Sequence, residues 1–126
     1  AAIAQAGVPQ GAVLPSHVTA EAAYATVRTY LKEDVAPDGI VAASDVIALN
    51  ALRAIADHGL RVPEDVAVVG YDDVFIAEQT TPPLTTIRQN FVLGAQMMVD
   101  LLFRRIAGEE AASVSLQPML VLRASA

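Results

Sequence analysis

The stretch VPEDVAVVGYDD, residues 62–73, decides the fold class. Its centre, 66–69, is a short and nearly continuous apolar run between a proline and a glycine. Such a run is typical of a strand that is buried on both faces in a parallel sheet covered by helices. Asp72 and Asp73 follow it, and open α/β sheets bind ligands just beyond the carboxyl ends of their strands. The two acids are therefore either solvated side chains at a strand end or part of a binding site.

Strands and helices are expected to alternate on both sides of this run. The patterns predict strands at 11–14, 40–43, 66–69, 84–89 and 113–123, the last interrupted or placed at a sheet edge by Pro118. They predict the end of a helix at 1–6, a helix that begins after Thr19, a helix at 45–58, one helical turn at 75–79 and a long helix at about 91–107. This alternation is typical of βαβ units with a parallel sheet and right-handed crossovers, so the predicted fold class is α/β.

The composition limits the classes of function. At 126 residues the chain is one domain, long enough to bury a core. Fourteen acidic residues against eight basic ones give a formal net charge of −6, which opposes direct binding of nucleic acid. The chain has no cysteine, and His17 and His58 lie far apart, so we expect no disulfide and no metal site. No apolar run reaches the roughly 18 residues of a membrane span, and a start without methionine suggests the tail of a longer protein.

Three acidic side chains follow predicted strands. Asp45 opens a helix and is expected to cap it or to lie in its first turn. Adjacent side chains of an extended chain point in opposite directions, so at most one of Asp72 and Asp73 faces a given pocket. Gly70 allows a sharp turn or the close approach of a ligand. Tyr71 is expected in the core or at its rim, although a phenol beside a carboxylate also suits sugar or base stacking.

The signatures of common enzymes are missing. The sequence has no Gly-x-Ser-x-Gly elbow, no phosphate-binding glycine loop and no histidine near a candidate nucleophile. A phosphoacceptor receiver domain would share the length, the fold class and the paired acids. However, the sole lysine, Lys32, lies on an outer helix beside Glu33 and Asp34 instead of following a late strand. We therefore expect a binding function without a cofactor and not an enzyme.

Three stretches carry a resemblance to a known family: GIVAASDVIALNALRAIADHGLRVPEDVAVVGYDD, PPLTTIRQNFVLG and LVLRAS. In order and spacing they resemble the effector-binding region of the lactose/galactose-repressor family of bacterial transcription regulators, closely over 38–126 and more loosely over 1–37. The resemblance implies a Rossmann-like parallel sheet flanked by helices, of the periplasmic-binding-protein-like type I. It implies a cytoplasmic regulator, usually a repressor, in which a small molecule such as a sugar changes the affinity of an upstream helix-turn-helix for operator DNA. A periplasmic sugar- or solute-binding protein of the same fold is the alternative.

The resemblance also implies roles for single residues. Four of them match effector-binding positions: Asp72, Ser44, Gln89 and Phe91. Asp72 matches the acid that accepts hydrogen bonds from ligand hydroxyl or ring N–H groups, with Asp73 as a solvated or structural partner. Ser44 stands where many relatives have the longer side chain of asparagine.

A homodimer or higher oligomer is implied as well. Its contact would use Leu49, Arg53, Ala77, Glu78, Gln79, Thr80 and Thr81. Leu49 suits an ordinary core position equally well. Residues 1–89 and 117–126 are expected to form the C-terminal subdomain, and 90–116 an excursion that belongs with a missing N-terminal subdomain. The apolar stripe of helix 91–107 then needs another partner: a swapped neighbour, a rearranged dimer or the rest of the protein.

Overall fold

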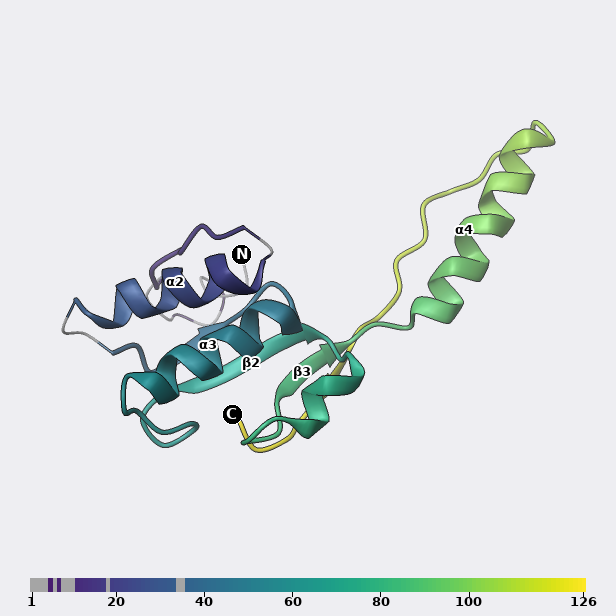
Figure 1. The fold of residues 1–126 in the computed structure, drawn as a ribbon. Helices are drawn as coiled ribbons and strands as arrows, with labels where there is room; N and C mark the ends of the chain where they lie inside the picture. Colours follow the sequence, from purple (N-terminus) through teal and green to yellow (C-terminus); the bar gives the residue numbers. More distant parts are fainter. Residues whose placement is uncertain (1–4, 6, 8–10, 18, 34–35) are drawn as a thin grey trace.

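The computed structural model describes residues 5, 7, 11–17, 19–33 and 36–126, and shows a sheet with helices packed on it and one helix standing apart (Figure 1). Along the chain the elements are α2 (Ala20–Leu31), β1 (Gly39–Val41), α3 (Asp45–Asp57), β2 (Ala67–Asp72), the 3-10 helix η1 (Phe75–Gln79), β3 (Thr85–Arg88), α4 (Phe91–Ile106) and β4 (Met119–Val121). The strands lie in the order β1-β2-β3-β4; the first three are parallel, and β4 is antiparallel to β3. The predicted α/β class is confirmed, with an antiparallel strand at one edge.

Local capping explains where α2, α3 and α4 begin. The side chains of Thr19, Ser44 and Asn90 each accept a hydrogen bond from the backbone amide three residues further on. Each bond satisfies one of the amide groups that the first turn of a helix leaves free. The predicted starts of α2, α3 and α4 are therefore confirmed.

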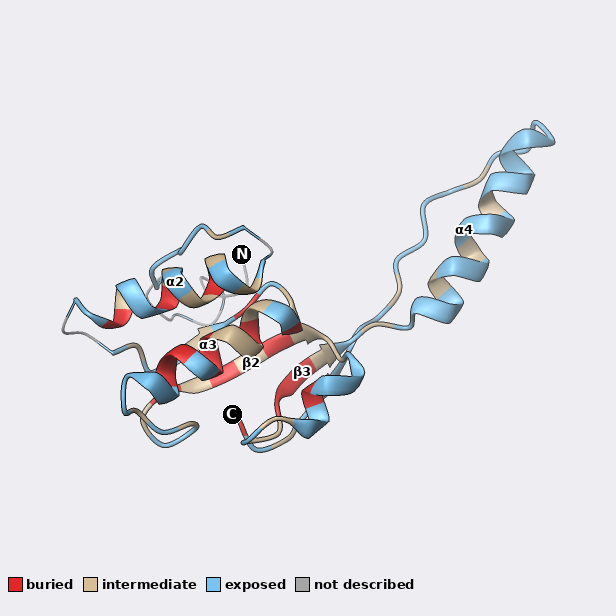
Figure 2. Cartoon of the chain, viewed as in Figure 1, coloured by how far each residue is buried: buried red, intermediate tan, exposed pale blue. Residues whose placement is uncertain are grey.

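The core lies between α3 and the sheet. α2 packs against α3, and α3 packs against β1 and β2. Figure 2 shows the buried positions concentrated on α3, β2 and β3. The largest fully buried apolar side chains of this core are Ile55, Leu84, Val66 and Val68. On the other face of the sheet Val41 is 86% exposed, so the described helices cover one face, where helices on both faces were expected.

The segment after β4 is fixed to the two central strands. Ser125 is fully buried, and its hydroxyl accepts a hydrogen bond from the Thr85 amide (2.8 Å) and donates one to the Val68 carbonyl (2.6 Å). The Val68 amide donates in turn to the Ser125 carbonyl at 2.7 Å. Although β4 is only three residues long, the returning chain is therefore tied to both β2 and β3.

Two strand predictions are wrong in whole or in part. Residues 11–14 form no strand: Val13 is 78% exposed, and no described strand pairs with them to satisfy their backbone groups. Of 113–123 only Met119–Val121 joins the sheet. Pro118 lacks an amide proton, and the residues before it run beside α4, away from any strand (Figure 1). The helix end expected at 1–6 lies almost wholly outside the described residues.

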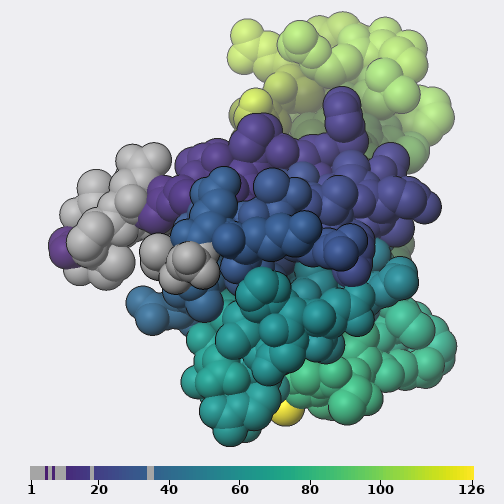
Figure 3. All heavy atoms as spheres, turned by 60° about the vertical axis from the view of Figure 1, so that its left-hand side comes forward, coloured from purple at the N-terminus to yellow at the C-terminus, as the bar shows by residue number. Residues whose placement is uncertain are grey.

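α4 and the segment that returns from it form an arm that leaves the body of the molecule. In the space-filling view of Figure 3 the arm is a separate lobe beyond the body that holds α2 and α3. No residue of α4 is buried. Its most exposed large apolar side chains are Phe91, Val92, Met98, Val99, Leu102, Phe103 and Ile106. None of the helices in the described residues is long and apolar enough to cross a membrane.

Candidate functional site

Asp72 and Gln89 meet at the carboxyl ends of two neighbouring parallel strands. Asp72 ends β2, and in the sheet register it lies opposite Arg88, the last residue of β3. Gln89 follows, and its Nε2 donates a hydrogen bond to Oδ1 of Asp72 at 3.1 Å. Both residues are half-buried. The structure thus brings together two of the four residues expected to bind an effector, at the edge where open α/β sheets bind ligands.

A cavity of about 350 Å³ opens beside this pair. Gln89 lines it together with Phe91, a third expected residue, and with Tyr71. The remaining walls come from the arm and its return: Asn90, Gly94, Ala95, Met97, Met98, Leu101, Val114, Leu116, Gln117 and Pro118. Apolar walls with two aromatic rings and a few polar groups are the usual make-up of a small-molecule pocket.

Tyr71 is the wall residue that sequence analysis placed at the core or its rim. It is half-buried and lines the cavity. The signal that could have assigned it is its position directly before Asp72, at the end of a strand that leads to the site. An aromatic ring there offers a flat apolar surface, which suits the apolar face of a sugar or a base.

Asp72 and Ser44, the other two expected residues, are not among the residues that line this cavity; Asp72 adjoins it through its hydrogen bond with Gln89.

Ser44 has a structural contact instead. It is half-buried, and its hydroxyl oxygen accepts the Ile47 amide at 3.4 Å as the cap of α3. Its contact with an effector stays a prediction.

Asp73 is a structural partner and is not solvated. Its side chain is 5% exposed, and its carboxylate accepts hydrogen bonds from Nε of Arg88 and, at 2.7 Å, from Nη2 of Arg123. Burial raises the pKa of Asp73, but the hydrogen bonds from Arg123 and Arg88 and the two positive charges lower that pKa below its ordinary value. The carboxylate is therefore ionised at neutral pH.

The backbone at the two acids has an unusual conformation. Asp72 has a φ of 116° and Asp73 a φ of 55°. A non-glycine residue in this region costs about 1–3 kcal/mol and persists where the surrounding structure imposes it. Such conformations cluster at ligand-binding and catalytic sites, which supports a site at this strand end.

The Asp45 side chain holds the loop after β2 in place by hydrogen bonds. It lies in the first turn of α3, as predicted, but it is fully buried. Its Oδ2 accepts the Val74 amide at 2.8 Å, and its Oδ1 accepts the Thr86 hydroxyl. Gly70 makes room for it, because a Cβ at that position would clash with Oδ1 of Asp45. The expected role of Gly70 in a sharp turn or a ligand approach is thus replaced by a packing role.

The residues expected in a dimer contact differ in exposure. Leu49 is half-buried, whereas the Arg53 side chain is 71% exposed and lies 5.0 Å from the centre of the Tyr24 ring. Glu78, Gln79 and Thr81 are exposed, and Thr80 is half-buried. Ala77 is fully buried in this chain's own core, where its side chain supports η1 from inside, and its place in a dimer contact stays a prediction.

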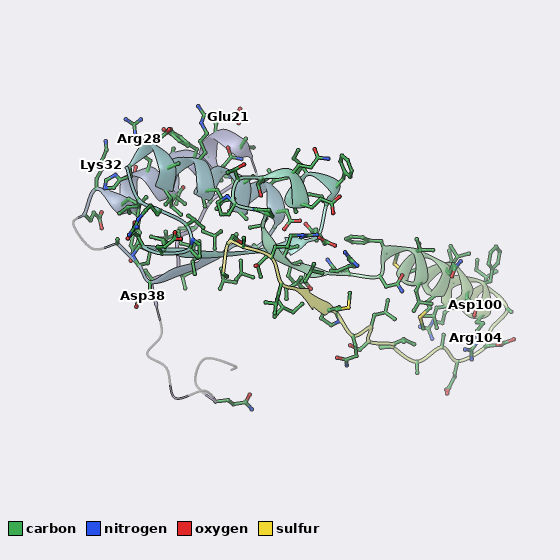
Figure 4. All side chains as sticks on the ribbon, turned by 90° about the horizontal axis from the view of Figure 1, so that it is seen from below. Glu21, Arg28, Lys32, Asp38, Asp100 and Arg104 are labelled. Carbon is green, nitrogen blue, oxygen red and sulfur yellow. The ribbon has the colours of Figure 1, made fainter. Side chains whose placement is uncertain are left out.

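Other charged side chains lie on the outer surface. Figure 4 shows Glu21, Arg28 and Lys32 pointing outward from α2, and Asp100 and Arg104 on the arm. Within the described part of the chain, no three His, Asp or Glu residues gather where they could hold a metal ion.

The chain is similar to several known regulators. The family model of the periplasmic binding protein-like domain matches residues 1–126. The HTH-type transcriptional repressor PurR of Pasteurella multocida (strain Pm70) is 40% identical over 107 residues, which are 83% of this chain and 32% of that repressor. The chain therefore spans about a third of the length of this relative.

Two solved structures match nearly the whole chain. A complex of the transcriptional regulator CelR with cellobiose has a TM-score of 0.90 and 39% identity, over 99% of this chain and 39% of the other. A lac repressor dimer bound to operator and the anti-inducer ONPF has a TM-score of 0.92 and 34% identity, over 98% of this chain and 43% of the other.

Proposed function

Because the chain belongs to the lactose/galactose-repressor family of bacterial transcription regulators, we propose that it is the effector-sensing part of a longer cytoplasmic regulator, usually a repressor. It binds a small molecule, a sugar or a related metabolite, and thereby changes the operator affinity of an upstream helix-turn-helix. The role is one of binding and not of catalysis. The observation that carries this proposal is the Asp72–Gln89 pair beside the cavity with its aromatic walls.

The chemistry of the site suits a polyhydroxylated ligand. A carboxylate such as that of Asp72 can accept two hydroxyl hydrogen bonds at once, and the Gln89 amide can both donate and accept. Tyr71 and Phe91 offer apolar surface for the faces of a sugar ring. Recognition through buried polar groups rejects analogues that lack a hydroxyl. The cellobiose bound by CelR supports a sugar as the ligand class.

The path of the chain and the exposed apolar surface of α4 support a two-subdomain arrangement. In this arrangement residues 1–89 and 117–126 form the C-terminal subdomain, and 90–116 pack with an N-terminal subdomain. Two observations support it: the chain leaves the sheet after β3 and returns at β4, and α4 carries its apolar side chains on the surface. A ligand at the point of crossing would contact both subdomains, so its binding would favour one relative orientation of the two.

The proposed test uses the full-length protein and a panel of mono- and disaccharides that includes cellobiose and lactose. Calorimetry is expected to find one sugar that binds, and fluorescence anisotropy is expected to show that this sugar changes operator affinity by about 5- to 150-fold. A sugar that binds without any change in operator affinity would favour the periplasmic solute-binding protein. The absence of any binding sugar would count against a sugar effector.

We propose further that the chain pairs with a second copy. The contact would use Leu49, Arg53, Glu78, Gln79, Thr80 and Thr81, with Ala77 behind them. The dimer of the lac repressor supports this proposal. A dimer supplies the two-fold symmetry that a palindromic operator requires.

Arg53→Glu in the full-length protein is expected to raise the dimer dissociation constant by about tenfold or more, because it reverses a charge inside the contact. Analytical ultracentrifugation over a range of concentrations measures this constant. The matched control is Lys32→Glu, a charge reversal at an exposed position at the end of α2. Equal constants for the two variants would place the contact elsewhere.

A further inference from the structure

The carboxylate next to the candidate ligand acceptor is held more firmly than the acceptor itself. The Asp73 side chain is 5% exposed and binds two guanidinium groups, those of Arg88 and Arg123. Arg123 is fixed in turn, because its Nη1 donates to the Leu84 carbonyl at 2.8 Å and its backbone amide donates to the Thr85 hydroxyl at 2.9 Å. Asp73 therefore joins three segments: the end of β2, the end of β3 and the chain that returns after β4.

This ion cluster and the candidate site use adjacent residues of the same two strand ends. Asp73 follows Asp72, Arg88 precedes Gln89, and Asp72 lies opposite Arg88 in the sheet register. The Asp73–Arg88 ion pair and the Asp72–Gln89 hydrogen bond therefore both link the end of β2 to the end of β3. Because both links attach to the same short stretch of backbone, a change in the first is expected to shift the second.

The turn at the two acids depends on such links. Both Asp72 and Asp73 have positive φ values, which non-glycine residues keep only where their surroundings impose them. One residue further on, the Val74 amide is fixed by its hydrogen bond to Asp45. Between these two residues, the carboxylate of Asp73 anchors the turn to Arg88 and Arg123.

We propose that Asp73 is a positioning residue for effector binding. Bound by Arg88 and Arg123, it holds Asp72 in the orientation in which Asp72 accepts a hydrogen bond from Gln89 and from the hydroxyls of a ligand. This proposal rests on the proposed function of the same site. It assigns to Asp73 no contact with the ligand.

The test is a double-mutant cycle in the full-length protein, with cellobiose as the probe and calorimetry as the measurement. Asp73→Asn is expected to weaken binding on the order of tenfold, the effect of misplacing one hydrogen bond to a charged group. In the Asp72→Asn background the same change is expected to have little further effect, because Asp73 acts through Asp72. The matched control is Asp65→Asn: Asp65 is also paired with an arginine, Arg61, but it precedes β2 at the far end of the strand.

The outcomes separate the inference from the function on which it rests. If Asp72→Asn weakens binding but Asp73→Asn behaves like Asp65→Asn, the positioning role falls and the site stands. If the effects of Asp72→Asn and Asp73→Asn are additive, Asp73 supports the fold in general and the inference also falls. If Asp72→Asn leaves cellobiose binding intact, the assigned site itself is wrong.

A second readout needs no ligand. The side-chain amide signals of Gln89, recorded by NMR in ¹⁵N-labelled full-length protein, report on its hydrogen bond to Asp72. Asp73→Asn is expected to move them toward the values of solvated glutamine, and Asp65→Asn to leave them in place. If Asp73→Asn fails to fold, Arg88→Gln makes the same test more mildly, because Arg123 remains, and Arg88→Lys should restore part of the wild-type signal. Unmoved Gln89 signals in these variants would overturn the inference.

Discussion

Asp72→Ala in the full-length protein is expected to weaken effector binding by about a hundredfold or more. A carboxylate can accept two ligand hydroxyls at once, hydrogen bonds to a charged group contribute about 1.5–3 kcal/mol each, and a factor of ten in affinity corresponds to about 1.4 kcal/mol. The change also removes the acceptor that orients the Gln89 amide. Calorimetry with the sugar that the panel identifies measures the loss.

Operator binding in the absence of effector is expected to stay unchanged in this variant, because Asp72 lies at a strand end and outside the core. Anisotropy with operator DNA tests this expectation. Asp65→Ala serves as the control: it removes an acid whose pKa is lowered to about 2 by its hydrogen bonds with Arg61, at the opposite end of β2. An unchanged effector affinity in Asp72→Ala would assign the ligand hydroxyls to other groups.

Asp45→Ala is expected to lower the free energy of unfolding by about 3 kcal/mol. The change leaves the partly buried Val74 amide and the buried Thr86 hydroxyl without their acceptor, and an unsatisfied buried group costs about 1–3 kcal/mol. Urea unfolding of the full-length protein, followed by circular dichroism, measures the loss. The control is Asp38→Ala, an exposed acid before β1 that points away from the body in Figure 4.

A variant in β2 tests the same contact between Gly70 and Asp45. Gly70→Ala places a Cβ against Oδ1 of Asp45 and 2.9 Å from Cδ2 of Leu84, and overpacking of this kind costs about 1–3 kcal/mol. A loss no larger in Asp45→Ala than in Asp38→Ala would show that water or another group satisfies Val74 and Thr86 once the carboxylate is gone.

The parts of the fold that depend on neighbours in the sequence could be predicted. The cap Thr19, the Ser44-Asp45 pair and the run at 66–69 carry their signals within a few residues, so the starts of α2 and α3 and the place of the central strand were predicted, although Ser44 and not Asp45 caps α3 and the strand continues to Asp72. Residues 11–14 have a strand-like composition, but a strand also needs a partner, and composition does not reveal whether one is in reach. The role of Asp45 could not be predicted because its partners, Val74 and Thr86, lie 29 and 41 residues away.

In the candidate site, too, features with local sequence signals could be predicted, and features that depend on distant residues could not. Asp72, Gln89 and Phe91 were proposed from motifs, and the structure places Asp72 against Gln89, and Gln89 and Phe91 at one cavity. The burial of Asp73 was not predictable, because one of its two arginines, Arg123, lies 50 residues away. Paired acids look alike in a sequence, and only the fold shows that Asp73 is anchored by two arginines while Asp72 accepts a hydrogen bond from Gln89.

The order of the strands in the sheet has a consequence for how this protein is made. The strands lie in the sheet in the order in which they are synthesised. β2 can therefore pair with β1, and β3 with β2, as soon as each has left the ribosome. β4 must wait until the whole arm has been translated, and Arg123 emerges later still. Contacts between distant segments form late because closing a long loop costs entropy. We therefore expect the turn that carries Asp72 to remain loosely held during translation and to reach its final geometry only when the end of the chain has docked.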